Sequence, residues 1–137
     1  GCFEAYSSAT GLVRMTAQAS EFNHDSILTH MIRQDGKVSA RTAYNAMKQG
    51  DPVGKAVTEQ YIKYLSCGIA NAINIFQPDI LCIGGGVCNE GDTMLVPLRA
   101  AVAEQIYSKN SAKNTEIVIC SLGNDAGIIG AAMLFKG

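Results

Sequence analysis

The stretch at residues 80–87 constrains the fold of this 137-residue chain more than any other. A short apolar run, residues 80–83, stops at three consecutive glycines, Gly84, Gly85 and Gly86, here called the glycine triplet. An apolar run that ends at a turn signal is typical of a buried strand in a parallel sheet. Ligands usually bind at the carboxyl edge of open α/β sheets, so the triplet is the first candidate for a functional site.

A strand, helix and strand are predicted around this stretch. Before it, apolar residues keep a helical period over residues 52–76, and a proline two residues later ends that helix. After it, we expect a polar loop, a helix that begins at Met94 or Pro97 and ends at Tyr107, and an apolar strand over residues 116–120. This pattern predicts a parallel, right-handed crossover unit with both sheet faces covered. The expected fold class is therefore α/β and helix-rich.

The first fifty residues read as helices. Apolar spacing predicts one helix over residues 4–19 and a second over about 26–35. A third is expected to be capped by Ser39 and to stop at Gly50. Asp51 then suits the N-cap of the long helix, with a proline in its first turn, so two helices should meet at a sharp corner.

The second half carries the long helix, both strands and a last helix. Gly68, in the middle of the long helix, costs about 1 kcal/mol relative to alanine and predicts a close approach by another backbone or a ligand. The last helix is expected over residues 126–136, capped by Asp125. We therefore divide the single 1–137 unit into a helical segment, 1–50, and a segment 51–137 on which the strands lie.

Charge and length narrow the class of protein. The net charge of −1 offers no concentrated basic face for nucleic acid or an anionic membrane. No apolar run reaches the ~20 residues that a membrane-spanning helix needs. The first residue is not methionine, and two strands alone do not make a stable sheet. We expect the chain to be a piece of something longer, with further strands supplied by an N-terminal part or by another chain.

The five cysteines are scattered and odd in number. Several fall inside predicted helices and strands, which favours buried, reduced thiols that pack as small apolar residues. We therefore expect a cytoplasmic protein rather than a disulfide scaffold.

The residues of the triplet loop leave the chemistry open. The triplet is not followed by the Lys-Ser/Thr of a phosphate-binding loop, and it lacks the spacing of the dinucleotide fingerprint. Bare backbone can touch a flat or anionic ligand directly, but three glycines can also serve only to turn the chain. Glu90 and Asp92 are expected to solvate the loop that follows.

Several motifs together resemble the ROK family of bacterial repressors and sugar kinases. That family has a zinc-and-sugar motif, Cys-x-Cys-Gly-x-x-Gly-Cys-x-Glu, followed by alanine and an aromatic residue. The residues that match its end here are Gly1, Cys2, Glu4, Ala5 and Tyr6. The stretches at 50–52, 74–78, 83–87 and 126–132 also lie where such kinases have them. The resemblance covers the whole chain and is closest to the glucokinase branch.

The resemblance implies the carboxyl-terminal part of an actin-like, ribonuclease-H-like ATPase domain. Such kinases transfer the γ-phosphoryl group of Mg-ATP to a sugar hydroxyl, in a cleft between two lobes. By this resemblance Cys2 is one ligand of a structural Zn²⁺, Glu4 accepts hydrogen bonds from the sugar, and the triplet lies against the adenosine. The hinge between the lobes is expected near Gly130.

Parts of the family pattern have no counterpart in this chain. The aspartate general base, the glycine-threonine phosphate loop and the other zinc ligands are missing. Because phosphoryl transfer depends on positioning and charge stabilisation, we expect these 137 residues alone to be inactive, although the parent is a kinase. The expected ligands are a hexose, ATP with Mg²⁺, and Zn²⁺. A homo-oligomer is expected because the helices of residues 4–50 offer apolar faces.

Other functions remain open on the sequence. The chain resembles the effector-binding part of a sugar-responsive ROK repressor as well, which would bind DNA through a segment before residue 1. Another ROK kinase, such as a fructokinase or an N-acetylmannosamine kinase, is a further alternative. The last is a non-enzymatic α/β domain whose glycines only turn the chain.

Overall fold

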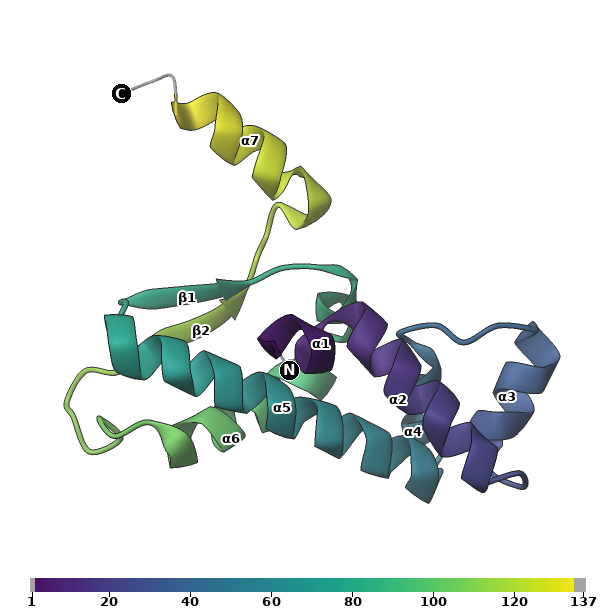
Figure 1. Cartoon of the computed structure of the whole chain (residues 1–137). Coiled ribbons are helices and arrows are strands. Elements are labelled where there is room, and N and C mark those ends of the chain that lie inside the picture. The colour runs from purple at the N-terminus through teal and green to yellow at the C-terminus, as the bar shows by residue number, and fades with distance from the viewer. Residues whose placement is uncertain (1, 135–137) are drawn as a thin grey trace.

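The computed structural model describes residues 2–134 and shows a helical body beside a two-stranded sheet (Figure 1). Gly1 and residues 135–137 lie outside the described residues, and with them the predicted end of the helix over 126–136. The elements in chain order are α1 (Phe3–Ser7), α2 (Ala9–Phe22), α3 (Ile27–Asp35), α4 (Thr42–Lys48), α5 (Pro52–Phe76), β1 (Ile80–Ile83), a 3₁₀ helix η1 (Gly86–Glu90), α6 (Asp92–Gln105), β2 (Glu116–Ile119), a 3₁₀ helix η2 (Gly123–Asp125) and α7 (Ala126–Met133).

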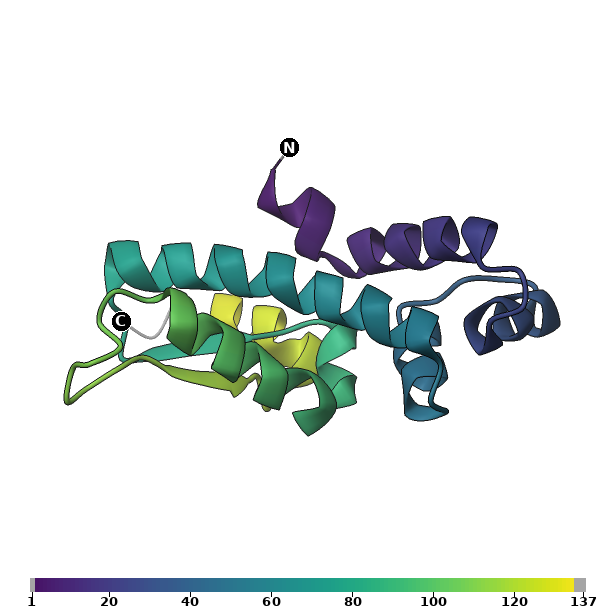
Figure 2. The same cartoon turned by 90° about the horizontal axis from the view of Figure 1, so that it is seen from below.

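The long helix α5 is the element around which the body packs, and its bounds confirm the prediction. Its N-cap is Asp51, whose carboxylate accepts hydrogen bonds from Val53 N at 3.0 Å and from Leu28 N at 2.6 Å. It ends at Phe76, and the C-cap residue Gln77 adopts a left-handed conformation before the proline. Figure 2 shows α1 and α2 on one side of α5, and α6 and the sheet on the other.

The two strands pair in parallel, with Ile80 opposite Glu116 and Ile83 opposite Ile119. The predicted crossover through α6 is therefore confirmed. The prediction that both sheet faces are covered is wrong for the described residues, because Ile80 is 57% exposed and Cys82 is exposed too. Successive side chains of β1 point to opposite faces of the sheet. Those on one face pack against the core, and those on the other are exposed because α5 and α6 cover only one face.

The predicted helix over residues 4–19 is two helices. Ser8 lies between α1 and α2 with an extended backbone, and its hydroxyl accepts a hydrogen bond from Gly11 N at 3.0 Å. Ser8 is thus an N-cap, and the turn brings α1 back over the start of α2. A Cβ at Gly11, in the first turn of α2, would lie 3.0 Å from Ala5 O, so glycine lets the two helices approach closely.

Some of the predicted helix ends agree with the structure, and others differ from it. The α3 helix is capped by Ser26 and ends at a left-handed Gly36, which agrees with the helix predicted over about residues 26–35. The prediction that Ser39 caps α4 is wrong: the cap position is Arg41, and Ser39 N instead donates to the Thr42 hydroxyl at 3.0 Å. Asp125 has the N-cap position of α7 but makes no side-chain capping bond.

The helix α6 begins earlier than predicted. It starts at Asp92, carries Pro97 inside its second turn, and stops at Gln105, because Ile106 has an extended backbone. Proline has no N–H, so Pro97 cannot donate the usual hydrogen bond to the carbonyl of Thr93 four residues earlier, and α6 lacks one intrahelical bond at this point. The α6 helix packs against α5 and closes the core.

Gly68 does mark a close approach, but not by the partner predicted. A Cβ at Gly68 would lie 1.9 Å from the Phe3 ring, so a side chain of α1, rather than a backbone or ligand, fills the space. The core around α5 is almost completely buried, and its largest side chains include Leu12, Leu28, Tyr44, Ile73, Met94, Leu98 and Val102.

Within residues 2–134, no helix has both the length and the apolar composition that crossing a membrane requires.

Candidate functional site

The glycine triplet leaves β1 with its backbone open to solvent. Gly85 has a φ of +104°, a conformation that favours glycine, and a Cβ at Gly85 or Gly86 would meet no atom within 4 Å. A Cβ at Gly84 would touch only the Cys120 sulfur, at 3.6 Å. The structure therefore places the triplet where predicted, as a bare and accessible strip of backbone that a flat ligand can approach.

The turn that follows holds the triplet in place. Cys88 N donates to Gly85 O at 3.0 Å, and Gly91 N donates to Cys88 O at 3.0 Å, which closes η1. The Cys88 side chain is buried, and its thiol lies 3.5 Å from Ile83 O. Burial and the neighbouring Cys120 raise the pKa of this thiol. The loop is thus a fixed shape anchored at both ends, rather than a loose connection.

The prediction that Glu90 and Asp92 only solvate this loop is wrong for Glu90. Its side chain is 6% exposed, and its carboxylate accepts a hydrogen bond from Lys48 Nζ at 2.5 Å. Asp92 is the first residue of α6, in the turn where an acidic residue favours the helix dipole. No local sequence signal indicates Lys48 as the partner of Glu90, because the two residues lie 42 positions apart.

The predicted sugar and zinc residues lie elsewhere. Cys2 precedes α1, Glu4 lies in its first turn, and both side chains are exposed. Within the described residues, no three His, Cys, Asp or Glu side chains are grouped closely enough to hold a metal ion. Cys2 has the right chemistry for one zinc ligand, but the residues described here do not form a complete tetrahedral site.

The two predicted half-sites are separated by the long helix. In Figure 2, α1 lies on one side of α5, and the loop between β1 and η1 lies on the other. The described residues bring the triplet together with Cys88 and Cys120, but they do not bring it to Glu4. Beside Cys2, a pocket of about 360 Å³ lies between α1 and α5, and Cys67 lines it too.

The cysteine prediction is only partly right. All five cysteines have free thiols in the structure. Cys88 is buried, but Cys2, Cys67 and Cys82 are exposed, so packing as apolar residues explains only a minority of them. Helix and strand periodicity could not show this, since it does not tell which side of an element is covered.

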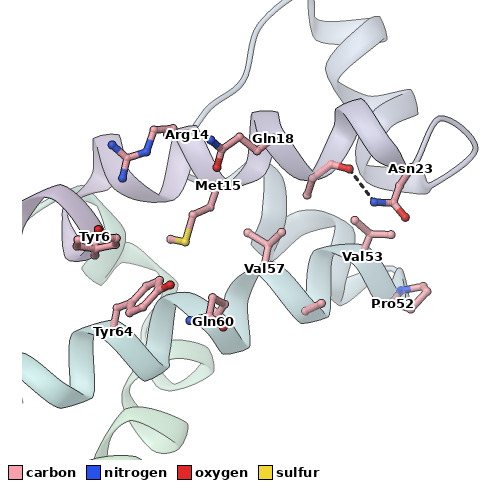
Figure 3. Close-up of a pocket in the computed structure, with 12 residues that line it drawn as sticks. Tyr6, Arg14, Met15, Gln18, Asn23, Pro52, Val53, Val57, Gln60 and Tyr64 are labelled. Carbon is pink, nitrogen blue, oxygen red and sulfur yellow. Dashed lines mark hydrogen bonds between the residues drawn. The ribbon is translucent and has the colours of Figure 1, made fainter. Parts of the chain in front are cut away.

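Figure 3 shows a larger groove that sequence reasoning missed, between α2 and α5. Its volume is about 710 Å³, and it is lined by residues of α1, α2 and α5 together with Asn23. The Tyr6 and Tyr64 rings meet at one end with centroids 5.1 Å apart, and the Arg14 guanidinium lies 6.0 Å from the centre of the Tyr6 ring. Arg14 also donates to Ala5 O at 2.6 Å, which fixes α1 against α2.

The arrangement of strands and helices matches sugar kinases of the actin-like ATPase fold. The structure of a ROK family glucokinase from Streptomyces griseus in complex with glucose and AMPPNP superposes with a TM-score of 0.83 and 28% identity, over 100% of this chain and 45% of that one. A ROK family transcriptional regulator, a homolog of the E. coli MLC protein, superposes with a TM-score of 0.76 over 99% of this chain and 33% of that one. At 23% identity, the second match shows the fold alone.

The ROK family model matches residues 1–137, and the chain belongs to that family. A glucokinase from Thermotoga maritima is 32% identical over 136 residues, which cover 99% of this chain and 43% of the relative. The chain thus spans less than half the length of this curated relative. The predicted family and fold class are both confirmed.

Proposed function

We propose that these residues are part of an ATP-dependent hexose kinase, most closely a glucokinase, which transfers the ATP γ-phosphoryl group to a sugar hydroxyl. The observation that carries the proposal is the open backbone of the glycine triplet at the carboxyl end of β1. The similarity to a glucokinase over the whole chain, and to one solved with glucose and AMPPNP, supports it.

In this proposal, the adenosine of ATP lies against Gly84, Gly85 and Gly86. The positive φ of Gly85 and the empty space around Gly85 and Gly86 let a ring approach the peptide planes without meeting a side chain. Mg²⁺ would accompany the nucleotide phosphates. We place the catalytic base and the phosphate contacts in a part of the longer protein outside this chain.

Glu4 is proposed as the sugar contact and Cys2 as one ligand of a structural Zn²⁺. An ionised carboxylate accepts hydrogen bonds only, which suits the several donors of a hexose. Glu4 is exposed at the start of α1, so it is free to face a ligand. The remaining zinc ligands would come from outside these residues, as would the second wall of the cleft, with its hinge near Gly130.

Substitution in the full-length protein separates the two roles. Glu4→Ala is expected to raise the sugar KM by about a hundredfold, with much less effect on the ATP KM, because hydrogen bonds to a charged group contribute about 1.5–3 kcal/mol each. Steady-state kinetics with both substrates varied would measure this. Equal changes in the two constants would remove Glu4 from the sugar site.

Gly85→Val tests the nucleotide half. The new side chain would fill the space against the triplet and strain a backbone that favours glycine, so ATP binding should weaken while sugar binding is kept. Gly36→Val is the matched control, since Gly36 has a φ of +66°, open surroundings and a place on a different element. If Gly85→Val left ATP affinity unchanged, the triplet would be only a turn.

A sugar-responsive repressor is the second candidate, and the fold shared with a ROK transcriptional regulator favours it. Sugar-dependent binding to operator DNA without ATP turnover would support it over the kinase. Turnover with fructose or N-acetylmannosamine but not glucose would identify a different ROK kinase. We further propose that the protein is cytoplasmic and forms a homo-oligomer. Free thiols and the exposed apolar residues Phe3, Tyr6 and Phe22 support them, and sedimentation would test the oligomer.

A further inference from the structure

The contact between Lys48 and Glu90 joins two parts of the molecule that chain connectivity leaves apart. Lys48 is the last residue of α4, and Glu90 is the last residue of η1, the 3₁₀ helix that starts at Gly86. Their charged atoms are 2.5 Å apart. The pair therefore connects the helical corner directly to the turn that begins with the third glycine of the triplet.

The α4 end of this link is rigid. Just after Lys48, the chain turns at Gly50 into Asp51, which is 2% exposed and accepts two backbone hydrogen bonds. The helix itself lies so close to α5 that a Cβ at Gly54 would be 2.7 Å from Met47 N. The backbone that carries Lys48 is therefore held in place at the end of α4.

At the η1 end, the Glu90 carboxylate is buried, so its pairing with Lys48 matters for the stability of the turn. The Glu90 side chain is 6% exposed, and a carboxylate in such surroundings is costly unless it is paired. Tyr44 of α4 is 1% exposed, and its hydroxyl has no hydrogen-bond partner among the described residues. Burial, and the nearby Tyr61 and Glu90, raise the pKa of this tyrosine, which agrees with Glu90 lying next to α4.

We propose that Glu90, held by Lys48, is a positioning residue that keeps η1 and the glycine triplet in the shape that binds the nucleotide. It touches neither substrate, and it acts through the backbone of residues 86–90. The inference rests on the proposed kinase function. An exposed salt bridge contributes little to stability, whereas removing the partner of a buried carboxylate leaves a charge without compensation and is destabilising.

The test is a double-mutant cycle in the full-length protein, with AMPPNP and glucose affinities measured by calorimetry. Glu90→Gln and Lys48→Met should each weaken AMPPNP binding about tenfold and leave glucose binding within about twofold. The double variant should be no weaker than either single one, because both remove the same contact. The charge reversal, Lys48→Glu combined with Glu90→Lys, should recover part of the lost AMPPNP affinity. Lys48→Arg keeps the positive charge and should retain nearly all of the wild-type affinity.

The control is Lys55→Met, which breaks the pair between Lys55 and Glu59, at 3.7 Å on an exposed face of α5. It should leave both affinities unchanged. Lys48 is 47% exposed at its side chain, so Lys48→Met should still fold even if Glu90→Gln does not. If the wild type binds no AMPPNP, the proposed function fails and this inference fails with it. If the wild type binds and Lys48→Met binds equally well, or if the two losses add, the inference alone is overturned.

Discussion

The helices α6 and α7 occupy equivalent places in the chain and have opposite surroundings. Each follows a strand of the same parallel pair and a short 3₁₀ turn. In α6, Leu98 is fully buried and Met94 and Val102 are 1% exposed. In α7, which carries no charged residue, Ile128 is 73% exposed and Met133 is 57% exposed. Figure 1 shows α7 extending away from the helical body, whereas α6 lies along α5.

The difference shows that apolar composition does not determine burial by itself. The α6 helix is buried because α5 offers a long complementary face, and α7 has no such face within the described residues. A contiguous apolar surface of this kind usually marks an interaction site. We propose that this surface and the open face of β1 make contacts outside this chain, which spans 43% of the length of its Thermotoga maritima relative.

The largest expected effect compares a leucine of α6 with an isoleucine of α7. Leu98→Ala should lower the free energy of unfolding of the 137-residue chain by about 3–5 kcal/mol, because it leaves a cavity in a packed core. Ile128→Ala, on an exposed surface, should change it by less than about 0.5 kcal/mol. Urea unfolding followed by circular dichroism measures both. Similar losses would mean that α7 is packed in solution and that the comparison is wrong.

A second comparison uses two glycines within helices. A Cβ at Gly54 of α5 would lie 2.8 Å from Ala43 O and 2.7 Å from Met47 N, so Gly54→Ala must push α4 away and should cost about 2–3 kcal/mol. A Cβ at Gly130 of α7 would meet no atom within 4 Å. Gly130→Ala should instead stabilise α7 by up to about 1 kcal/mol through helix propensity. A destabilised Gly130→Ala chain would reveal a close neighbour at α7.

The smallest expected effect is a pH dependence of the stability of the helical part, which comes from Tyr61 of α5. Burial raises the pKa of Tyr61 to about 12 from an ordinary value of 10.0, and its hydroxyl donates to Ser7 O at 2.9 Å. The folded state therefore favours the neutral phenol. Its contribution is complete below pH 10 and is lost as the pH rises towards 12, by up to about 2 kcal/mol.

Tyr61→Phe should flatten the fall in stability between pH 10 and 12, measured by urea unfolding at each pH. Tyr107→Phe is the control, because Tyr107 is 70% exposed and should leave the slope unchanged. An unchanged slope in Tyr61→Phe would show that Tyr61 ionises as freely in the folded chain as in the unfolded one.

Local sequence signals predicted much of this fold. The strand at residues 80–83 and the helix α5 were predictable to the residue, because a glycine turn, an Asp-Pro cap and a terminating proline mark their ends. The ROK motifs likewise predicted the family that the comparisons show. The position of the triplet at the carboxyl end of β1 was predictable for the same reason.

What could not be predicted depends on distant neighbours. The buried Glu90 needs Lys48, and the space at Gly68 is filled by Phe3, each from a remote part of the chain. Exposure of Cys67 and Cys82 depends on which faces are covered, which periodicity does not report. The helix break at Ser8 was missed because apolar residues keep the helical period on both sides of it, although a serine N-cap is a local sequence signal.

Sugar-dependent ADP formation, measured side by side for the 137-residue chain and the full-length protein, tests the central claim most directly. The account predicts glucose-dependent ADP release by the full-length protein and none above the ATP background by the 137 residues alone. Equal rates per molecule would contradict the view that the nucleotide loop is one part of a site completed elsewhere. No turnover with any hexose in the full-length protein would contradict the kinase itself.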